Sequence, residues 1–324
     1  MHDIIIIGGG PSGMNCAIAA QDAGLSCLIV EKGGITDAIR RFPVNMTFFS
    51  TPDLLELGDI PFSTTNVRPT RQEALQYYRL VAARRALPMR LHTRVDAIDR
   101  TATGFDVVLA DGERLAAQHV VVATGYFDYT NRLGVPGEDL PHVSHYYDEP
   151  YRYAQTDVLV VGGRNSAVET ALELYRHGAR VTLVHRREEL GNSVKYWVRP
   201  DIVNRLKDGS ITAHFQTTVR EIRPGEVDLQ HADGSHRTVH ADFVFPLIGY
   251  RPDEALLRGA GVNLNEVLIP DYDKETFQTN VPGLYIAGSV ACGCETWNIF
   301  IENGRAHADP IIRHIQHMRG PARG

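Results

Sequence analysis

Two of the four cysteines of this chain, Cys292 and Cys294, stand one residue apart in the stretch ACGCETWNIF. Such a thiol pair could do redox chemistry, because a disulfide across one residue closes a cramped ring and is readily reduced. A metal site would need more ligands, and since the sequence has no second cysteine cluster we predict no metal. The pair could also simply pack a loop. The surrounding elements decide between these interpretations.

The N-terminal end of the chain reads as a strand, a glycine turn and a helix. Four isoleucines at 4–7 predict a strand buried on both faces, and an alanine-rich helical segment follows the turn. The turn consists of Gly8, Gly9, Gly10, Pro11, Ser12 and Gly13. Its first glycine permits the tight bend, its third lets amides approach a pyrophosphate, and its last lets helix and strand pack closely. The next strand, at 27–30, ends at Glu31, whose carboxylate can accept hydrogen bonds from a ribose.

The same unit occurs a second time. A valine-rich strand at 158–161 runs into a second turn and helix. This turn consists of Gly162, Gly163, Arg164, Asn165, Ser166 and Ala167. Aligning the two turns puts His185 in register with Glu31, and each half later closes on a similar β segment. We therefore predict an α/β fold with two Rossmann-like dinucleotide-binding domains.

The aligned positions differ in charge. Glu31 would repel a 2'-phosphate, whereas His185 is followed by Arg186 and Arg187, whose guanidinium groups can bind one with paired hydrogen bonds. The second domain is thus predicted to prefer NADPH over NADH, although a solvated basic strand end is the simpler alternative. Arg164 replaces the usual second glycine and could supply a further cation to the pyrophosphate.

The composition is that of an ordinary globular protein. The 324 residues, 43% of them hydrophobic, can bury a core large enough for about two domains. A net charge of -6 without blocks of like charge argues against nucleic-acid and anionic-membrane partners. The N-terminal apolar run is too short for a signal peptide or a membrane span, so we expect a cytoplasmic protein without a disulfide framework.

The order of these motifs resembles the flavoproteins with two dinucleotide-binding domains, above all the low-molecular-weight thioredoxin reductases. The resemblance covers nearly the whole chain and includes Ala-Thr-Gly at 123–125 and Leu-Tyr-Ile-Ala-Gly at 284–288. It implies a thioredoxin-reductase-like fold in which the NADPH domain is inserted into the FAD domain. The FAD domain would then comprise residues 1–127 and 247–324, and the NADPH domain residues 128–246.

Two departures from thioredoxin reductases matter. Those enzymes carry a Cys-x-x-Cys before the second turn, but the corresponding run at 143–150 contains no cysteine. Their Ala-Gly-Asp motif, which contacts the flavin side chain, is replaced by Ala-Gly-Ser at 287–289. The thioredoxin reductase mechanism, as usually drawn, cannot operate here.

A narrower resemblance is to the bacillithiol disulfide reductases, bacterial enzymes that depend on FAD and NADPH. It rests on Thr-Phe-Phe-Ser at 47–50, Gly-Asp-Ile-Pro-Phe at 58–62, Lys-Tyr-Trp at 195–197 and Phe-Ile-Glu-Asn-Gly-Arg at 300–305. Well-known members have a redox cysteine directly after the proline of the first turn. This chain has Ser12 there, so that thiol is absent.

The resemblance also implies which residues contact each cofactor. For FAD these are Gly8, Gly10, Pro11, Ser12, Gly13, Glu31, Lys32, Phe49, Val95, Thr124, Gly125, Gly288 and Ser289. For NADPH these are Gly162, Gly163, Arg164, Asn165, Ser166, Ala167, His185, Arg186 and Arg187. Ser12 is expected to donate a hydrogen bond to FAD from the helix N-terminus.

Cys292 and Cys294 are the catalytic candidates. In this fold their segment is expected to bring a helix N-terminus to the flavin, and such an end stabilises a thiolate. The adjacent Glu295 opposes that effect. Cys16 and Cys27 lie in a predicted helix and strand and are interpreted as small buried hydrophobic residues.

The leading hypothesis is therefore an NADPH-dependent FAD oxidoreductase that reduces a low-molecular-weight thiol disulfide or a small redox protein, expected as a homo-oligomer, dimer or tetramer. Electrons would pass through Cys292 and Cys294, through a thiol of the partner, or directly from the flavin. One alternative is a ferredoxin or flavodoxin NADP reductase of the same fold, which needs no thiol. Others are a redox-sensing flavoprotein and, from His145 ahead of the second turn, a protein like the flavin monooxygenases.

Overall fold

The computed structural model describes residues 1–319, which divide into two compact units. The first comprises Met1–Tyr129 and the chain from Tyr250 onward, and the second comprises Thr130–Gly249. The chain passes between them twice, where the short strands β7 (Tyr129–Thr130) and β15 (Tyr250–Arg251) pair with each other.

A seven-stranded sheet forms the centre of the first unit, in the order β3-β2-β1-β6-β5-β4 with β16 paired to β6. Its strands are β1 (His2–Ile7), β2 (Cys27–Val30), β3 (Met89–Arg90), β4 (Val95–Arg100), β5 (Phe105–Leu109), β6 (Arg114–Val122) and β16 (Leu284–Ile286). The pairs of β1 with β2 and β6 are parallel, and those of β5 with β4 and β6 are antiparallel. The carboxyl ends of β1, β2, β6 and β16 therefore meet at one edge, where the first glycine turn begins.

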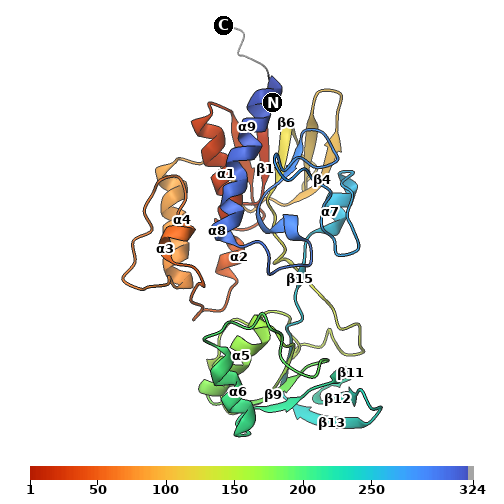
Figure 1. The fold of residues 1–324 in the computed structure, drawn as a ribbon. Coiled ribbons are helices and arrows are strands. Elements are labelled where there is room, and N and C mark those ends of the chain that lie inside the picture. The colour runs from red at the N-terminus through yellow and green to blue at the C-terminus, as the bar shows by residue number, and fades with distance from the viewer. Residues whose placement is uncertain (320–324) are drawn as a thin grey trace. The chain divides into compact units, whose positions relative to one another are not determined.

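Helices of the first unit pack on both faces of this sheet. Its helices are α1 (Pro11–Asp22), α2 (Asp37–Arg40), α3 (Pro52–Leu55), α4 (Arg71–Arg84), α7 (Glu254–Gly259), α8 (Ile301–Gly304) and α9 (Ala308–Arg319), with the short 3₁₀ helices η2 (Gly288–Cys292) and η3 (Arg305–His307). Because side chains alternate along a strand, Ile4 and Ile6 join the core beneath α1, α4 and α9, whereas Ile5 and Ile7 join the core beneath α7. Helices α1 and α9 lie side by side (Figure 1).

The second unit repeats the same plan on a smaller scale. Its parallel sheet has the order β10-β9-β8-β14. The strands are β8 (Asp157–Val161), β9 (Arg180–Val184), β10 (Thr212–His214) and β14 (Phe243–Pro246). One face packs against α5 (Asn165–Arg176) and α6 (Arg199–Lys207), with the 3₁₀ helix η1 (Tyr151–Tyr153) nearby in the same core. The other face packs against the antiparallel sheet of β11 (Thr217–Arg223), β12 (Gly225–His231) and β13 (His236–Ala241).

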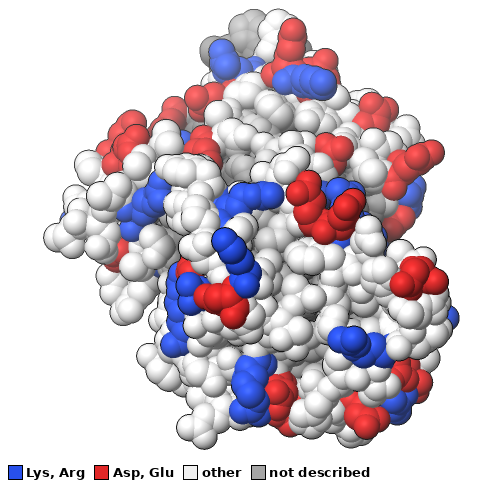
Figure 2. Space-filling view, turned by 60° about the horizontal axis from the view of Figure 1, so that its bottom comes forward, with Lys and Arg blue, Asp and Glu red and all other residues white. Residues whose placement is uncertain are grey.

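The predicted α/β fold and its repeated strand, turn and helix are confirmed, as β1-α1-β2 in the first unit and β8-α5-β9 in the second. Within residues 1–319, the helices are too short or too polar to cross a membrane. On the face drawn in Figure 2, acidic and basic side chains are interspersed. The net charge is therefore not gathered into one patch on that face.

Candidate functional site

The first glycine turn is built so closely that side chains are excluded from it. Gly8 has a φ of 113°, and a Cβ there would lie 2.5 Å from the carbonyl oxygen of Ala123. A Cβ on Gly13 would lie 2.1 Å from the carbonyl oxygen of Gly8. These approaches bring α1 and the end of β6 against the turn, which is the role that the sequence predicted for the two glycines.

The space in front of α1 is open by contrast. No atom lies within 4 Å of the position where a Cβ on Gly10 would project. Gly10 is the N-cap residue, no side chain caps the helix, and Pro11 begins it. A helix N-terminus with uncapped amides and open space before it fits a phosphate group.

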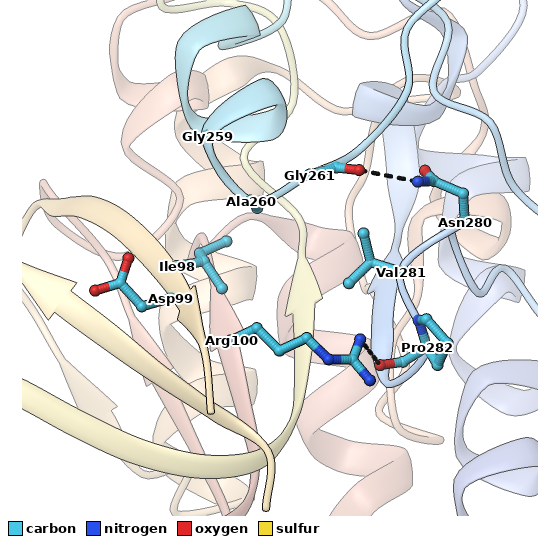
Figure 3. Close-up of a pocket in the computed structure, with 9 residues that line it drawn as sticks. All are labelled: Ile98, Asp99, Arg100, Gly259, Ala260, Gly261, Asn280, Val281 and Pro282. Atoms are coloured by element: carbon cyan, nitrogen blue, oxygen red, sulfur yellow. Dashed lines mark hydrogen bonds between the residues drawn. The ribbon is translucent and has the colours of Figure 1, made fainter. Parts of the chain in front are cut away.

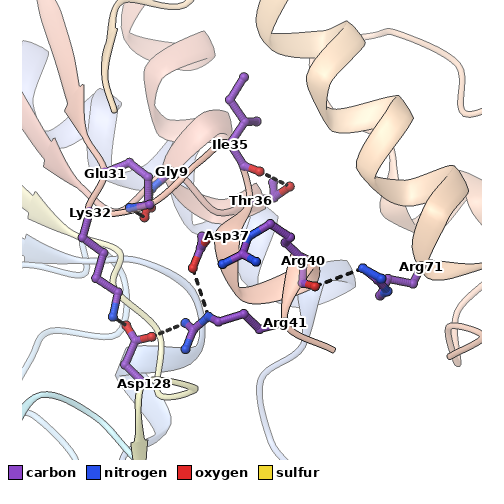
Figure 4. A network of polar contacts seen from close by, with 11 residues as sticks. Gly9, Glu31, Lys32, Ile35, Thr36, Asp37, Arg40, Arg41, Arg71 and Asp128 are labelled. Carbon is purple, nitrogen blue, oxygen red and sulfur yellow. Dashed lines mark hydrogen bonds and ion pairs between the residues drawn. The ribbon is translucent and has the colours of Figure 1, made fainter. Parts of the chain in front are cut away.

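Glu31 is buried and holds the turn from the end of β2. Its Oε2 accepts a hydrogen bond from the amide of Gly9 at 2.6 Å (Figure 4), and its Oε1 accepts one from the amide of Gly33 at 2.7 Å. Burial nevertheless raises the pKa of Glu31. A carboxylate oxygen has a second lone pair, so a ribose contact is still open to it. The structural role of Glu31 toward Gly9 was not foreseen from the sequence.

Lys32, predicted to contact FAD, belongs to an ion-pair network. Its Nζ lies 2.7 Å from Oδ2 of Asp128. Asp128 also pairs with Arg41, whose Nε lies 2.9 Å from Oδ2 of Asp37 (Figure 4). The network ties the segment before β7 to the residues that follow β2. No local spacing in the sequence indicates it, because Asp128 is remote in the chain from its partners.

Segments remote from one another in the chain converge around Ser12 and Ser289. A Cβ on Gly288 would lie 2.3 Å from the Oγ of Ser12, and a Cβ on Gly304 would lie 3.2 Å from the same atom. A Cβ on Gly125 would lie 3.2 Å from the Oγ of Ser289. The structure thus brings together the predicted residues of the first turn, of the segment after β6 and of η2.

Two further groups at this convergence concern a ligand. The Oγ1 of Thr124 is buried and, among the described residues, has no hydrogen-bond partner, an arrangement that costs about 1–3 kcal/mol unless a ligand or water supplies the partner. The amide of Gly288 donates to Nδ1 of His307 at 3.1 Å, which requires a neutral imidazole. Burial lowers the pKa of His307 to about 4. Sequence reasoning missed His307 because nothing in its local pattern distinguishes it.

Phe49 and Val95 lie on other elements. Phe49 is 53% exposed, and the guanidinium carbon of Arg68 lies 5.8 Å from its ring centroid. Val95 begins β4 and packs, partly buried, against the core under α7. Their assignment to FAD stays a prediction.

The cysteine pair does not lie at a helix start, so that expectation was wrong. Cys292 is the last residue of η2, and the next helix begins only at Ile301. The C-terminal end of a helix disfavours a thiolate. Burial raises the pKa of Cys292 to about 11 and also raises that of Cys294. The Cys292 thiol donates to the carbonyl oxygen of Ser289 at 3.0 Å. Both cysteines are free, and their raised pKa values favour the protonated thiol.

Cys16 and Cys27 are buried in the core, as predicted. Burial raises the pKa of Cys16 to about 12 and that of Cys27 to about 11. His145 lies inside the second unit, with its Nε2 3.3 Å from Oε1 of Glu138.

The second glycine turn has the same close packing. Gly162 has a φ of 147°, and a Cβ there would lie 2.5 Å from the carbonyl oxygen of Leu247 and 2.7 Å from the Cβ of Ala167. Ala167 is buried, Ser166 is exposed in the first turn of α5, and no side chain caps that helix. The turn therefore offers open amides to a phosphate in the same way as the first.

Asn165 fastens a loop to this turn. Its Nδ2 donates to the carbonyl oxygen of Ser193 at 2.9 Å, and its Oδ1 accepts from the amide of Lys195 at 2.9 Å. Its side chain is thus engaged within the protein, and a cofactor contact from Asn165 would come from its backbone.

Cationic side chains gather around the second turn. His185 lies against it, since a Cβ on Gly163 would lie 2.4 Å from the imidazole ring. Burial lowers the pKa of His185, and three surrounding arginines lower it further. These are Arg186, Arg187 and Arg164, all exposed. Because like charges held together repel one another, an anion bound among them would be stabilised.

A pocket of about 530 Å³ lies elsewhere in the first unit, between β4 and α7 (Figure 3). Its polar side chains bond the protein itself: Arg100 donates to the carbonyl oxygen of Pro282 at 3.1 Å, and Asn280 donates to that of Gly261 at 2.9 Å. It contains none of the predicted site residues.

Comparison with known proteins shows which protein family this chain belongs to. The family model of the pyridine nucleotide-disulphide oxidoreductases matches residues 5–288, so the chain belongs to that family and is an oxidoreductase. It is 40% identical to bacilliredoxin reductase Bdr from Bacillus subtilis (strain 168) over 96% of each chain. It matches the structure of bacillithiol disulfide reductase Bdr (YpdA) from Bacillus cereus with a TM-score of 0.95 and 40% identity, covering 98% of this chain and 99% of that one. Within the wider family, the chain belongs to the bacillithiol disulfide reductases.

The thioredoxin-reductase-like fold is confirmed as well. The thioredoxin reductase of T. acidophilum matches with a TM-score of 0.75 at 22% identity, covering 98% of both chains. At that identity the likeness concerns the fold alone.

Proposed function

We propose that this chain uses NADPH, through bound FAD, to reduce the disulfide of a low-molecular-weight thiol of the bacillithiol type. The observation that carries the proposal is the contrast at the equivalent strand ends, with buried Glu31 in the first unit and His185, Arg186 and Arg187 in the second. The first suits a ribose without a 2'-phosphate, and the second suits a ribose that carries one. When bound, FAD supplies a carrier that takes a hydride from NADPH and passes two electrons to the disulfide, which with protons becomes two thiols.

The residues of the first unit fit FAD. The open amides at the N-terminus of α1 would bind its pyrophosphate, and Glu31 would use its remaining lone pairs for the ribose. The buried hydroxyl of Thr124 would gain the partner that it lacks in the protein. Ser12 would donate a hydrogen bond to the cofactor, beside Gly288. The other proposed contacts come from Gly8, Pro11, Gly13, Lys32, Phe49, Val95, Gly125 and Ser289.

The residues of the second unit fit NADPH. The uncapped start of α5 would bind the pyrophosphate through backbone amides, including that of Asn165. Arg186 and Arg187 would bind the 2'-phosphate, with His185 at the adjacent ribose. Binding the phosphate would relieve the repulsion among these cations.

The acceptor step is proposed to use no thiolate of this chain. Cys292 and Cys294 are protonated at neutral pH because burial raises their pKa values, and the serine at position 12 cannot form a mixed disulfide. The two remaining routes are direct reduction of the disulfide and transfer through a thiol of a partner, such as a small redox protein.

Stopped-flow reduction of the purified flavoprotein under anaerobic conditions tests the proposal. NADPH should reduce the flavin much faster than NADH does, and bacillithiol disulfide, or the oxidised form of a small redox protein, should reoxidise it. A wild-type protein that NADPH fails to reduce, or that no disulfide reoxidises, would refute it. Light scattering on the same sample checks the proposed homo-oligomer.

A second candidate is a ferredoxin or flavodoxin NADP reductase. The raised pKa values of the buried Cys292 and the partly buried Cys294 favour it, since single-electron transfer to such a partner needs no thiol. The same acceptor screen separates the two, because reoxidation by ferredoxin or flavodoxin but by no disulfide would select the second candidate.

A further inference from the structure

Arg164 stands where the usual dinucleotide-binding turn has its second glycine, but its backbone conformation does not require a glycine. As the N-cap residue of α5 it has φ -114° and ψ -172°, an extended conformation that any residue adopts. Gly162, two residues earlier, has a φ of 147° and no room for a side chain. The turn thus retains Gly162, which its geometry requires, and carries the cationic Arg164 at a position where no glycine is required.

The stem of Arg164 points toward the loop that follows β9. A Cβ on Gly191 would lie 3.5 Å from the Cγ of Arg164 and 3.2 Å from the carbonyl oxygen of Gly163. The amide of Gly191 donates to that same carbonyl oxygen at 2.9 Å. The loop from Arg186 to Gly191 therefore returns to the turn, and the Arg164 side chain lies along its last residue.

The electrostatics agree with this direction. Loss of solvation lowers the pKa of Arg164, and the charges of Arg187 and Arg186 lower it further. The imidazole of His185, which lies against Gly163, is subject to all three cations. Within residues 1–319, neither Arg186 nor Arg187 forms an ion pair with a carboxylate of the chain.

We propose that Arg164 is a specificity-determining residue that binds the 2'-phosphate of NADPH together with Arg186 and Arg187, and that it does not serve the pyrophosphate. This inference rests on the proposed function, in which the second unit binds NADPH. The pyrophosphate is common to NADPH and NADH, whereas only NADPH carries the 2'-phosphate. The two possible contacts of Arg164 therefore leave different signatures.

The test is Arg164→Gly, which restores the usual glycine of the turn. The value of kcat/KM for flavin reduction by NADPH should fall about ten- to a hundredfold, the range for losing one charge-assisted partner, and that for NADH should stay unchanged. Calorimetry should show the same loss of affinity for NADP+ and none for NAD+. Arg164→Lys, which keeps the charge but not the planar fork, should fall between the wild type and Arg164→Gly.

Arg176→Ala provides a matched control, because Arg176 is an exposed arginine in the last turn of the same helix. It should leave both nucleotides unaffected. Equal losses for NADP+ and NAD+ in Arg164→Gly would assign Arg164 to the pyrophosphate, and no loss for either would exclude Arg164 from nucleotide binding. Each of these results would overturn this inference and leave the proposed function standing. If wild-type protein fails to bind NADP+ and is not reduced by NADPH, the proposed function fails as well.

Discussion

The two glycine turns share a backbone design and differ in what their strand ends do. In both, a glycine at positive φ lies under a carbonyl oxygen from a neighbouring strand end, at Ala123 in the first unit and Leu247 in the second. In the first unit the strand-end residue, Glu31, bonds the turn itself through two amides. In the second, the strand end carries the exposed Arg186 and Arg187, neither of which forms an ion pair with a carboxylate among the described residues. The same architecture thus supports two different sites. In the first unit the strand-end carboxylate stabilises the turn, and in the second unit the strand-end cations can bind an anionic ligand.

The largest expected effect tests the role of the cationic residues at the strand end of the second unit. Replacing both Arg186 and Arg187 by Ala should lower kcat/KM for NADPH about a thousandfold, since each guanidinium contributes roughly 2 kcal/mol of charge-assisted bonding. The value for NADH should change little. Stopped-flow flavin reduction measures both, and unchanged flavin content serves as the control. A similar loss with NADH would contradict the assignment of these side chains to a 2'-phosphate.

The close packing of the two glycine turns is tested by exchanging the aligned residues Gly13 and Ala167. Gly13→Ala places a Cβ 2.1 Å from the carbonyl oxygen of Gly8 and should destabilise the first unit by about 3 kcal/mol. At the aligned position of the second unit, Ala167→Gly should cost only about 1 kcal/mol, through helix propensity and a small cavity. Urea unfolding and FAD retention measure the difference. Equal costs would mean that the first turn can relax in a way that the structure does not suggest.

A pH experiment tests the first unit through His307, whose ring accepts a hydrogen bond from the amide of Gly288. Its folded pKa of about 4 lies below the ordinary value of 6.5, so its contribution to stability is present above pH 6.5 and is lost as the pH falls toward 4. About 2 kcal/mol should be lost between pH 7 and pH 5. His307→Asn keeps an acceptor for the Gly288 amide but does not titrate, so its unfolding free energy should fall less over that range. Parallel pH profiles for variant and wild type would refute this role.

The smallest expected effect concerns the cysteines. Cys292→Ser and Cys294→Ser should each change disulfide-dependent turnover less than about twofold. Burial raises the pKa of Cys292 to about 11 and also raises that of Cys294, and a protonated thiol is a poor nucleophile. The pH profile of turnover should show no thiol ionisation below pH 9. A loss of tenfold or more in either variant, with flavin reduction by NADPH intact, would restore the paired-thiol route.

Local features of this molecule could be predicted from the sequence. The isoleucine and valine runs, the glycine spacing and the basic residues after β9 each lie within a few positions of the elements that they define. Gly8 and Gly13 indicated a close turn because their spacing is fixed by the geometry of one strand and one helix. Buried Cys16 and Cys27 followed from helix and strand patterns in the same way.

Contacts between remote segments could not be predicted. Asp128 pairs with Lys32, and His307 accepts from Gly288, through folding of the whole first unit. Such partners follow no periodicity, so no pattern reveals them. The expected helix start at Cys292 failed for a related reason: the direction of η2 depends on where the chain turns at Gly293, whose φ is 55°.

The bonds of Glu31 have a consequence for how cofactor preference can change. Altering the acidic residue at a strand end is an obvious way to admit a 2'-phosphate. In the second unit the aligned side chain, that of His185, packs against Gly163, and among the described residues it accepts no hydrogen bond from an amide of the turn. In the first unit the same substitution would release the amides of Gly9 and Gly33 together. Selection or engineering could therefore retune the proposed nicotinamide site by single steps, while the proposed flavin site would have to be rebuilt from two loops at once.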